Sequence, residues 1–170
     1  GARRAGFEIV SMAKVPEAQR LTDFTLTWEE AFSEHWGNTP TSQAEFEEIF
    51  ESAGPMGMYD ASVLAYTGDE PVGVVWAMPD ASMLATLAPG RQLAPSERVN
   101  FLGIGVLSQA RGQGVNLALA AHCYLYLVGQ GATHLSYTMV LDDNWPSRRT
   151  AEKLGAEVCA NYVVYRRSLI

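Results

Sequence analysis

The feature that most constrains this fold is a strand-to-helix junction in the second half of the chain. Val99 to Leu107 is an apolar run with the length of a buried strand. Val115 to Gly129 is longer and rich in leucine and alanine. Its apolar residues alternate in part as they would in a strand, but its length favours a buried helix. The linking turn carries Gly112 and Gly114, so the chain is expected to pass directly from a buried strand into a helix.

The flanking segments predict a mixed sheet with helices on both of its faces. Further strands are expected over residues 6–13, 63–66, 72–78, 133–141 and 158–165, and further helices over 17–36, 42–52 and 145–154. Residues 80–97 are expected to be an irregular insertion with at most a helical turn. A hairpin combined with two strand-helix-strand crossovers indicates an α/β protein. We expect one domain over residues 6–170, preceded by linker residues 1–5.

The charge of the chain is concentrated in one early segment. The formal net charge is −7, and residues 17–60 alone hold ten acids and one base, for a net charge of −9. Residues 61–170 hold eight acids and eight bases and are neutral overall. An acidic chain lacks the basic face that a general nucleic-acid binder needs. No run of 18 apolar residues is present, so no membrane partner is expected.

Cysteine and histidine usage points to a cytoplasmic protein without a metal. Cys123 and Cys159 are too few for a disulfide framework in 170 residues, which favours a reducing compartment. The three histidines show no ligand spacing with either cysteine. The chain begins with Gly1 rather than methionine, which leaves open an additional domain in a full-length protein.

The glycine turn has the chemistry of an anion site. A helix start offers unpaired N–H groups and the positive end of the helix dipole, and Arg111 adds charge. Gly112 and Gly114 allow the backbone to approach a phosphate closely. The turn is not a P-loop, because no Gly-Lys-Ser/Thr follows. Leu117 stands where the dinucleotide fingerprint requires glycine or alanine. On these residues alone, phosphate binding and a purely geometric role of the glycines are equally open.

The same stretch resembles the GNAT acyltransferase superfamily. Ile104-Gly105-Val106, followed by Arg111-Gly112-Gln113-Gly114, is similar to the family's strand and its Arg/Gln-x-x-Gly-x-Gly/Ala turn. A second block, Asn144 with Glu152-Lys153-Leu154-Gly155, follows in the family's order. Residues 30–37 and 143–146 also look like a bacterial subgroup that often carries two such domains in tandem.

The resemblance implies binding of acyl-CoA, most simply acetyl-CoA, and transfer of its acyl group to an amine. The pantetheine arm would pair with the strand in a gap where residues 99–107 splay from residues 133–141. The pyrophosphate would lie on the amides of the turn, and strand amides would polarise the thioester. Asn144 would contact the arm, and it is equally a helix N-cap before Pro146. The cofactor-binding residues implied are Ile104, Gly105, Val106, Leu107, Arg111, Gly112, Gln113, Gly114, Val115, Asn116 and Asn144.

The catalytic groups are less well defined by this resemblance. Ala151 stands where the family often has a tyrosine acid, and Asn100 where some members have a glutamate base. Tyr137 and Asp143 are the candidates for these roles, and core packing and loop solvation are their alternatives. Asn116 replaces a small residue, and would crowd the pyrophosphate or hydrogen-bond to it. The alternative function is therefore a non-catalytic acyl-CoA-binding or structural half of a tandem protein.

The acidic segment coincides with the wall of the acceptor cleft that the resemblance implies. Glu34, His35 and Trp36 end the first expected helix, and an acidic, aromatic lip would suit a cationic amine. The alternative is that these acids form the solvated faces of two amphipathic helices. The expected partner is a small-molecule or peptide amine, and a homodimer is also open.

Overall fold

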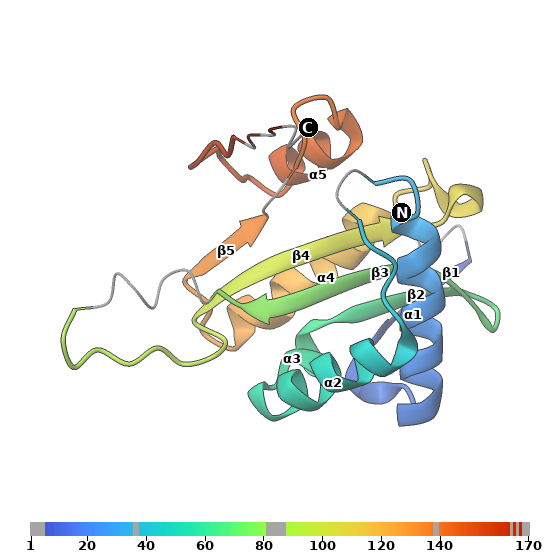
Figure 1. The fold of residues 1–170 in the computed structure, drawn as a ribbon, viewed down its shortest axis with the longest axis horizontal. Coiled ribbons are helices and arrows are strands. Elements are labelled where there is room, and N and C mark those ends of the chain that lie inside the picture. Colours follow the sequence, from blue (N-terminus) through green and yellow to red (C-terminus); the bar gives the residue numbers. More distant parts are fainter. Residues whose placement is uncertain are drawn as a thin grey trace.

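The structure is a computed structural model, and it describes residues 6–35, 38–80, 88–137, 140–163, 165 and 167. Its centre is a mixed sheet whose spatial order follows the chain (Figure 1). The strands are β1 (Phe7–Ser11), β2 (Val63–Thr67), β3 (Glu70–Pro79), β4 (Arg98–Val106) and β5 (His134–Tyr137). The first four strands run antiparallel to their neighbours, and β5 pairs parallel with β4. The predicted α/β class with a mostly antiparallel sheet is confirmed.

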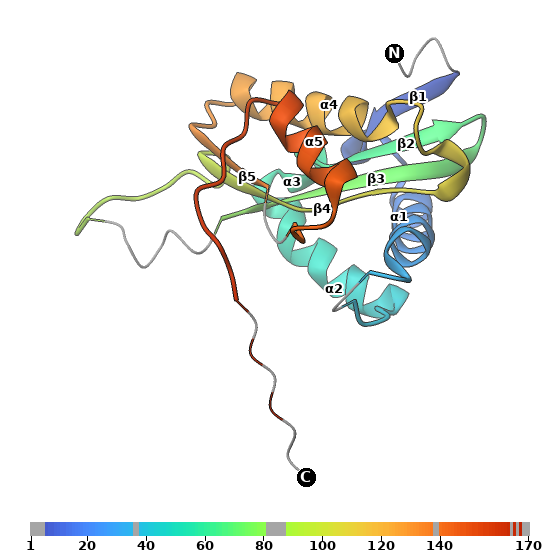
Figure 2. The same cartoon turned by 90° about the horizontal axis from the view of Figure 1, so that it is seen from above.

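Helices cover both faces of this sheet, as expected (Figure 2). The helices are α1 (Glu17–Phe32), α2 (Gln43–Ala53), α3 (Met58–Ala61), α4 (Val115–Gly129) and α5 (Trp145–Lys153). Helix α4 packs on one face, and α1 and α2 pack on the other. Short 3₁₀ turns occur at Met12–Lys14, Gly54–Met56 and Ser108–Ala110. The short helix α3 was not predicted, because Gly54, Pro55 and Gly57 make its surroundings read as a loop.

The two faces are filled by different kinds of side chain. Aliphatic residues of the sheet pack against α4, whose Leu119 and Leu127 are fully buried. The opposite face is an aromatic cluster centred on Phe24 of α1. Its ring lies 4.9 Å from Phe50 and 5.3 Å from Trp76, centroid to centroid, in edge-to-face geometry. Such pairs stabilise a core beyond the area that they bury, so α1 is held firmly on the sheet.

Helix boundaries agree with the sequence where a local signal marks them. Ser42 caps α2 through a reciprocal capping box with Glu45, at the start of the predicted helix 42–52. Helix α4 has the predicted bounds. Helix α1 is shorter than the predicted 17–36, because it ends at Phe32. There the Ser33 hydroxyl donates to Glu30 O at 2.9 Å, and the His35 N–H donates to Phe32 O at 2.9 Å, so three-residue turns replace the helix.

Three predicted strands differ from the structure. Strand β1 stops at Ser11, whose hydroxyl accepts from the Ala13 N–H and opens a 3₁₀ turn. Strand β5 spans only His134–Tyr137; residues 138 and 139 lie outside the described residues, and 140–141 are not in a strand. The predicted last strand, 158–165, is wrong, since its described residues form no strand. Their apolar side chains are exposed, including Val158 at 76%, so they do not pack on the sheet.

Both cysteines are free, and Cys123 is buried in α4. Burial raises the pKa of its thiol from 9.0 to about 12. The unfolded chain therefore loses this proton first as the pH rises above 9, and the folded state loses relative stability. We expect a fall of about 1–2 kcal/mol between pH 9 and 10.5 from this group. Urea unfolding of wild type and Cys123→Ala over this range measures it: the variant should show a shallower pH slope, and equal slopes would contradict the prediction.

Candidate functional site

Strand β4 leaves its neighbour β5 at a β-bulge. Along β3, Trp76 pairs with Gly103 and Ala77 pairs with Phe101, so Leu102 is left without a partner and half exposed. The last described pair between β4 and β5 is Phe101 with Tyr137. A bulge bends its strand and increases the local twist. Figure 1 shows the two strands diverging from this point, which is the splayed pair expected for the fold.

Beyond the bulge, β4 presents an open edge formed by two of its residues. The Leu107 N–H donates to Val72 O of β3 at 2.9 Å. Because the main-chain groups of successive strand residues point to opposite sides, those of Gly105 also face β3. The N–H and C=O groups of Ile104 and Val106 therefore face away from β3. Of the four strand residues implied in thioester binding, these two offer main-chain groups to an extended ligand.

Two glycines of β4 allow helix α1 to lie against this strand. A Cβ at Gly103 would stand 2.6 Å from Cη2 of Trp28, and one at Gly105 would stand 2.7 Å from Cβ of Ala31. Any larger residue would push α1 away from the open edge. From the sequence, Gly105 was considered only as part of the Ile104-Gly105-Val106 motif. A glycine inside a strand is itself a signal of close backbone approach.

The turn that follows β4 is built by backbone conformation. Gly112 and Gly114 have φ values of 76° and 81°, in the left-handed region that disfavours other residues. No atom lies within 4 Å of a Cβ built at either position. Gly114 is the N-cap of α4, and the next residue, Val115, anchors the helix in the core at 1% exposure. Two features predicted to favour anion binding, an open turn and a helix start, are thus both present.

Arg111 connects this turn to the open edge. Its Nε donates to Val106 O at 3.0 Å, and the side chain is exposed. The guanidinium therefore braces the end of β4 while it keeps its charge beside the turn. The neighbouring Gln113 donates through Nε2 to Gln109 O at 3.1 Å, which closes the turn on itself. The chain thus offers main-chain amides, a helix dipole and a cation to a polyanionic arm, so its residues fit the expected CoA.

Asn116 and Asn144 both have defined partners. Asn116 Nδ2 donates to Thr150 Oγ1 of α5 at 2.6 Å, and its Oδ1 accepts from the Leu117 N–H at 2.8 Å. Its side chain is therefore engaged with α5. Asn144 caps α5, because its Oδ1 accepts from the Ser147 N–H at 3.3 Å. The capping role weighed for Asn144 is thus present, and it leaves the amide end of this side chain for a ligand role.

The two catalytic candidates lie in different environments. Tyr137 is half-buried at the last β4–β5 pair, and its ring packs edge-on against Phe101 at 6.5 Å. Burial raises the pKa of its phenol, and a hydrogen bond with the Ser147 side chain partly offsets this effect. Asp143 is exposed in the loop before α5, where its carbonyl accepts from the Trp145 N–H. Tyr137 thus stands where the two strands separate, and Asp143 lies on an exposed loop.

The acids of residues 17–60, which the resemblance places at the acceptor cleft, fall into two groups: some are exposed and others have partners inside the protein. Glu34 is exposed after α1, His35 packs edge-on against Phe32 at 5.7 Å, and Trp36 lies outside the described residues. Other acids have internal partners: the Glu29 carboxylate accepts from the Thr41 N–H at 3.0 Å, and Asp23 accepts from the Tyr66 hydroxyl at 2.8 Å. Part of the negative charge therefore fastens α1 to its surroundings and is not available to a ligand.

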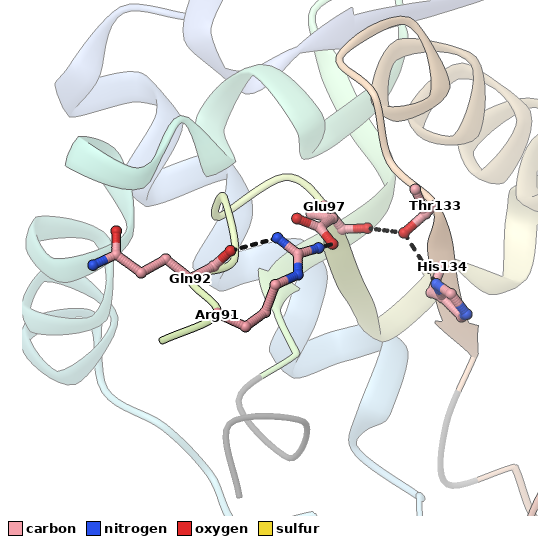
Figure 3. A network of polar contacts seen from close by, with 5 residues as sticks. All are labelled: Arg91, Gln92, Glu97, Thr133 and His134. Carbon is pink, nitrogen blue, oxygen red and sulfur yellow. Dashed lines mark hydrogen bonds and ion pairs between the residues drawn. The ribbon is translucent and has the colours of Figure 1, made fainter. Parts of the chain in front are cut away.

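A separate polar network lies at the opposite end of β4 (Figure 3). Arg91 forms an ion pair with Glu97, and its Nη1 donates to Gln92 O at 2.6 Å. The Thr133 hydroxyl donates to Glu97 O at 3.3 Å and also contacts His134 Nδ1 at 3.0 Å. This network joins the loop before β4 to the start of β5. In the part of the chain that the structure describes, no cluster of His, Cys, Asp and Glu could hold a metal ion.

The sequence matches the model of the acetyltransferase (GNAT) family over residues 21–156. The chain belongs to this family. The predicted family and the prediction of an N-acetyltransferase are confirmed, and the resemblance to tandem GNAT proteins stays a prediction. The matched span contains the open edge, the glycine turn and α5. Among curated proteins the sequence has no significant match. Within the described residues, no helix is long and apolar enough to cross a membrane.

Solved structures of GNAT proteins share this fold at low identity. A complex of AAC(6')-Iy with a bisubstrate analogue, CoA-S-monomethyl-acetylneamine, is 18% identical, covers 95% of this chain and 98% of its own, and has a TM-score of 0.64. The aminoglycoside 6'-N-acetyltransferase AAC(6')-Ih from Acinetobacter baumannii is 18% identical over 96% and 99%, with a TM-score of 0.61. An N-acetyltransferase from Staphylococcus aureus Mu50 is 14% identical over 88% and 82%, with a TM-score of 0.68. These likenesses establish the fold.

Proposed function

We propose that this GNAT protein transfers an acyl group, most simply acetyl, from CoA to an amine by direct attack on the thioester. The observation that carries this proposal is the continuous path from the bulge at Leu102 to the start of α4. Along it, the edge of β4 that faces away from β3, at Ile104 and Val106, leads directly into the turn with Gly112 and Gly114. The Val106 carbonyl on this edge already accepts from Arg111, so the open groups are the Val106 N–H and the N–H and C=O of Ile104. An extended, amide-containing arm that ends in a pyrophosphate has matching chemistry along its whole length.

The reaction requires one new bond and two proton movements. The neutral amine nitrogen attacks the thioester carbon, the C–S bond breaks, and the amine gives up a proton. The departing thiolate accepts a proton to become the CoA thiol. Negative charge develops on the carbonyl oxygen during attack. A main-chain N–H fixed on the open edge, from Ile104 or Val106, is the preorganised donor that stabilises such charge.

Tyr137 is the proposed proton donor to the thiolate. An ordinary tyrosine phenol is protonated at neutral pH, and burial raises the pKa of Tyr137 further. The residue stands at the point where β4 and β5 part. Asp143 is the proposed proton acceptor for the amine, acting through water because it is exposed. These roles support each other: a neutral phenol can give a proton, and an exposed carboxylate can take one.

The proposed acceptor is an amine that is protonated, and therefore cationic, when it is free in solution. Glu34 and His35 follow α1 directly, and Glu34 is exposed within residues 17–60, the segment that carries a net charge of −9. Such a field raises the local concentration of cations. AAC(6')-Iy and AAC(6')-Ih are aminoglycoside acetyltransferases, so aminoglycosides belong in any acceptor panel, beside polyamines, amino acids and short peptides.

The test combines calorimetry with acetyl-CoA and a thiol-release assay over that panel. We expect acetyl-CoA to bind with micromolar affinity and at least one amine to release CoA thiol above the hydrolysis background. Tyr137→Phe should lower kcat by about 100-fold with little change in KM for acetyl-CoA. Binding without turnover across the panel would favour the non-catalytic acyl-CoA-binding half instead. Absence of heat at millimolar acetyl-CoA would overturn both.

A further inference from the structure

We propose that Asn116 is a positioning residue whose bond to Thr150 fixes α5, and with it Asn144, relative to the glycine turn. This inference rests on the proposed function, because it concerns how the CoA site is held together. From the sequence, the Asn116 side chain was expected to crowd the pyrophosphate or to hydrogen-bond to it. The structure directs its side chain to α5 instead.

The contact is short, partly buried and continues into α5. Asn116 Nδ2 donates to Thr150 Oγ1 at 2.6 Å, and the Thr150 hydroxyl donates to Pro146 O at 3.0 Å. The Thr150 hydroxyl therefore accepts one hydrogen bond and donates one. Thr150 is only 4% exposed, so its oxygen has no water to replace a lost partner. Asn116 is the second residue of α4, so the bond reaches from the start of α4 to the second turn of α5.

Helix α5 has few other anchors among the described residues. Thr150 is its one buried residue there, and Trp145 is 56% exposed. The Trp145 ring stacks with Arg148, 4.8 Å away on the same helix, so this pair does not attach α5 to the core. The described residues after Gly155 are exposed and add no cover. The buried attachment of α5 is thus polar, and it is made to the helix that begins at the glycine turn.

The position of α5 matters for two residues of the proposed reaction. Asn144 is the N-cap of α5 and is the residue implied to contact the pantetheine arm. Ser147, one turn before Thr150, hydrogen-bonds to Tyr137. A shift of α5 would therefore move the arm contact and the partner of Tyr137 together. The pyrophosphate turn would stay in place, because Val115 anchors it in the core.

Two substitutions of Thr150 form a matched pair. Thr150→Val keeps the side-chain shape and removes the hydroxyl, whereas Thr150→Ser keeps the hydroxyl. We expect Thr150→Val to weaken acetyl-CoA binding about 10-fold in calorimetry and Thr150→Ser to change it less than about 2-fold. Binding of 3'-phospho-ADP, which has the phosphates but lacks the arm, should change less than about 2-fold in both variants. Amide hydrogen exchange should be faster throughout α5 in Thr150→Val alone.

The double variant completes the test. Asn116→Ala should match Thr150→Val, and combining the two should weaken acetyl-CoA binding no further, because each substitution removes the same bond between α4 and α5. Equal affinity of Thr150→Val and wild type for acetyl-CoA would overturn the inference while the proposed function stands. Parallel loss of 3'-phospho-ADP binding would also overturn it, since it would indicate general disruption. If wild type binds neither ligand, the proposed function fails and this inference fails with it.

Discussion

Replacing Gly114 with glutamate is expected to abolish measurable binding of CoA. Gly114 is the N-cap of α4, so the new carboxylate would stand where the turn amides and Arg111 are proposed to meet the pyrophosphate. Like charges about 5 Å apart near a protein surface repel by roughly 3 kcal/mol per pair. This corresponds to a loss of more than about 100-fold in affinity. The side chain has room, because no atom lies within 4 Å of a Cβ at Gly114.

Gly131 provides the matched control for this substitution. It also has a left-handed backbone, with φ of 87°, and no atom lies within 4 Å of its Cβ position. It follows the far end of α4, away from the turn. Gly131→Glu should therefore cost about the same 1–2 kcal/mol of folding stability while CoA binding is retained. Calorimetry of both variants, with their unfolding midpoints, checks this. Retained affinity in Gly114→Glu would refute the placement of the pyrophosphate.

The parts of this fold that the sequence predicted are those with local signals. The apolar run before Gly112, the length of Val115–Gly129 and the Ser42–Glu45 capping box each act within one or two turns of chain. Gly155, which directly follows the predicted helix 145–154, has a positive φ of 76° after α5. These features depend on backbone geometry that neighbouring residues determine, so one sequence is enough to find them.

The parts that were missed depend on partners distant in sequence. The bulge at Leu102 exists only in the register of β4 against β3, and it decides which main-chain groups are open. The Asn116–Thr150 bond joins residues 34 positions apart. The predicted strand over 158–165 had suitable apolar residues, but in the structure its described residues are exposed and pair with no described strand. In each case the deciding contact is tertiary.

The open edge of β4 also depends on a close contact that a single methyl group would break. Gly105→Ala would place a Cβ 2.7 Å from Cβ of Ala31 and 3.0 Å from the ring of Phe32. Ala31 is part of the helix backbone surface and cannot rotate away. We expect a loss of about 2–3 kcal/mol of folding stability and, because α1 must move off the edge, at least a 10-fold fall in kcat/KM for the acceptor. Urea unfolding and steady-state assays measure both.

The clash can also be relieved by a substitution in α1, at Ala31. This substitution distinguishes an effect of packing from an effect of lost glycine flexibility. Ala31→Gly alone should destabilise α1 by about 1 kcal/mol through helix propensity. Added to Gly105→Ala, it removes the atom that the new methyl meets, so the double variant should be more stable than Gly105→Ala and regain part of its activity. Gly129→Ala, where nothing lies within 4 Å, should leave stability and activity near wild type. If Ala31→Gly merely adds its own cost to Gly105→Ala, the contact between α1 and β4 is not what requires this glycine.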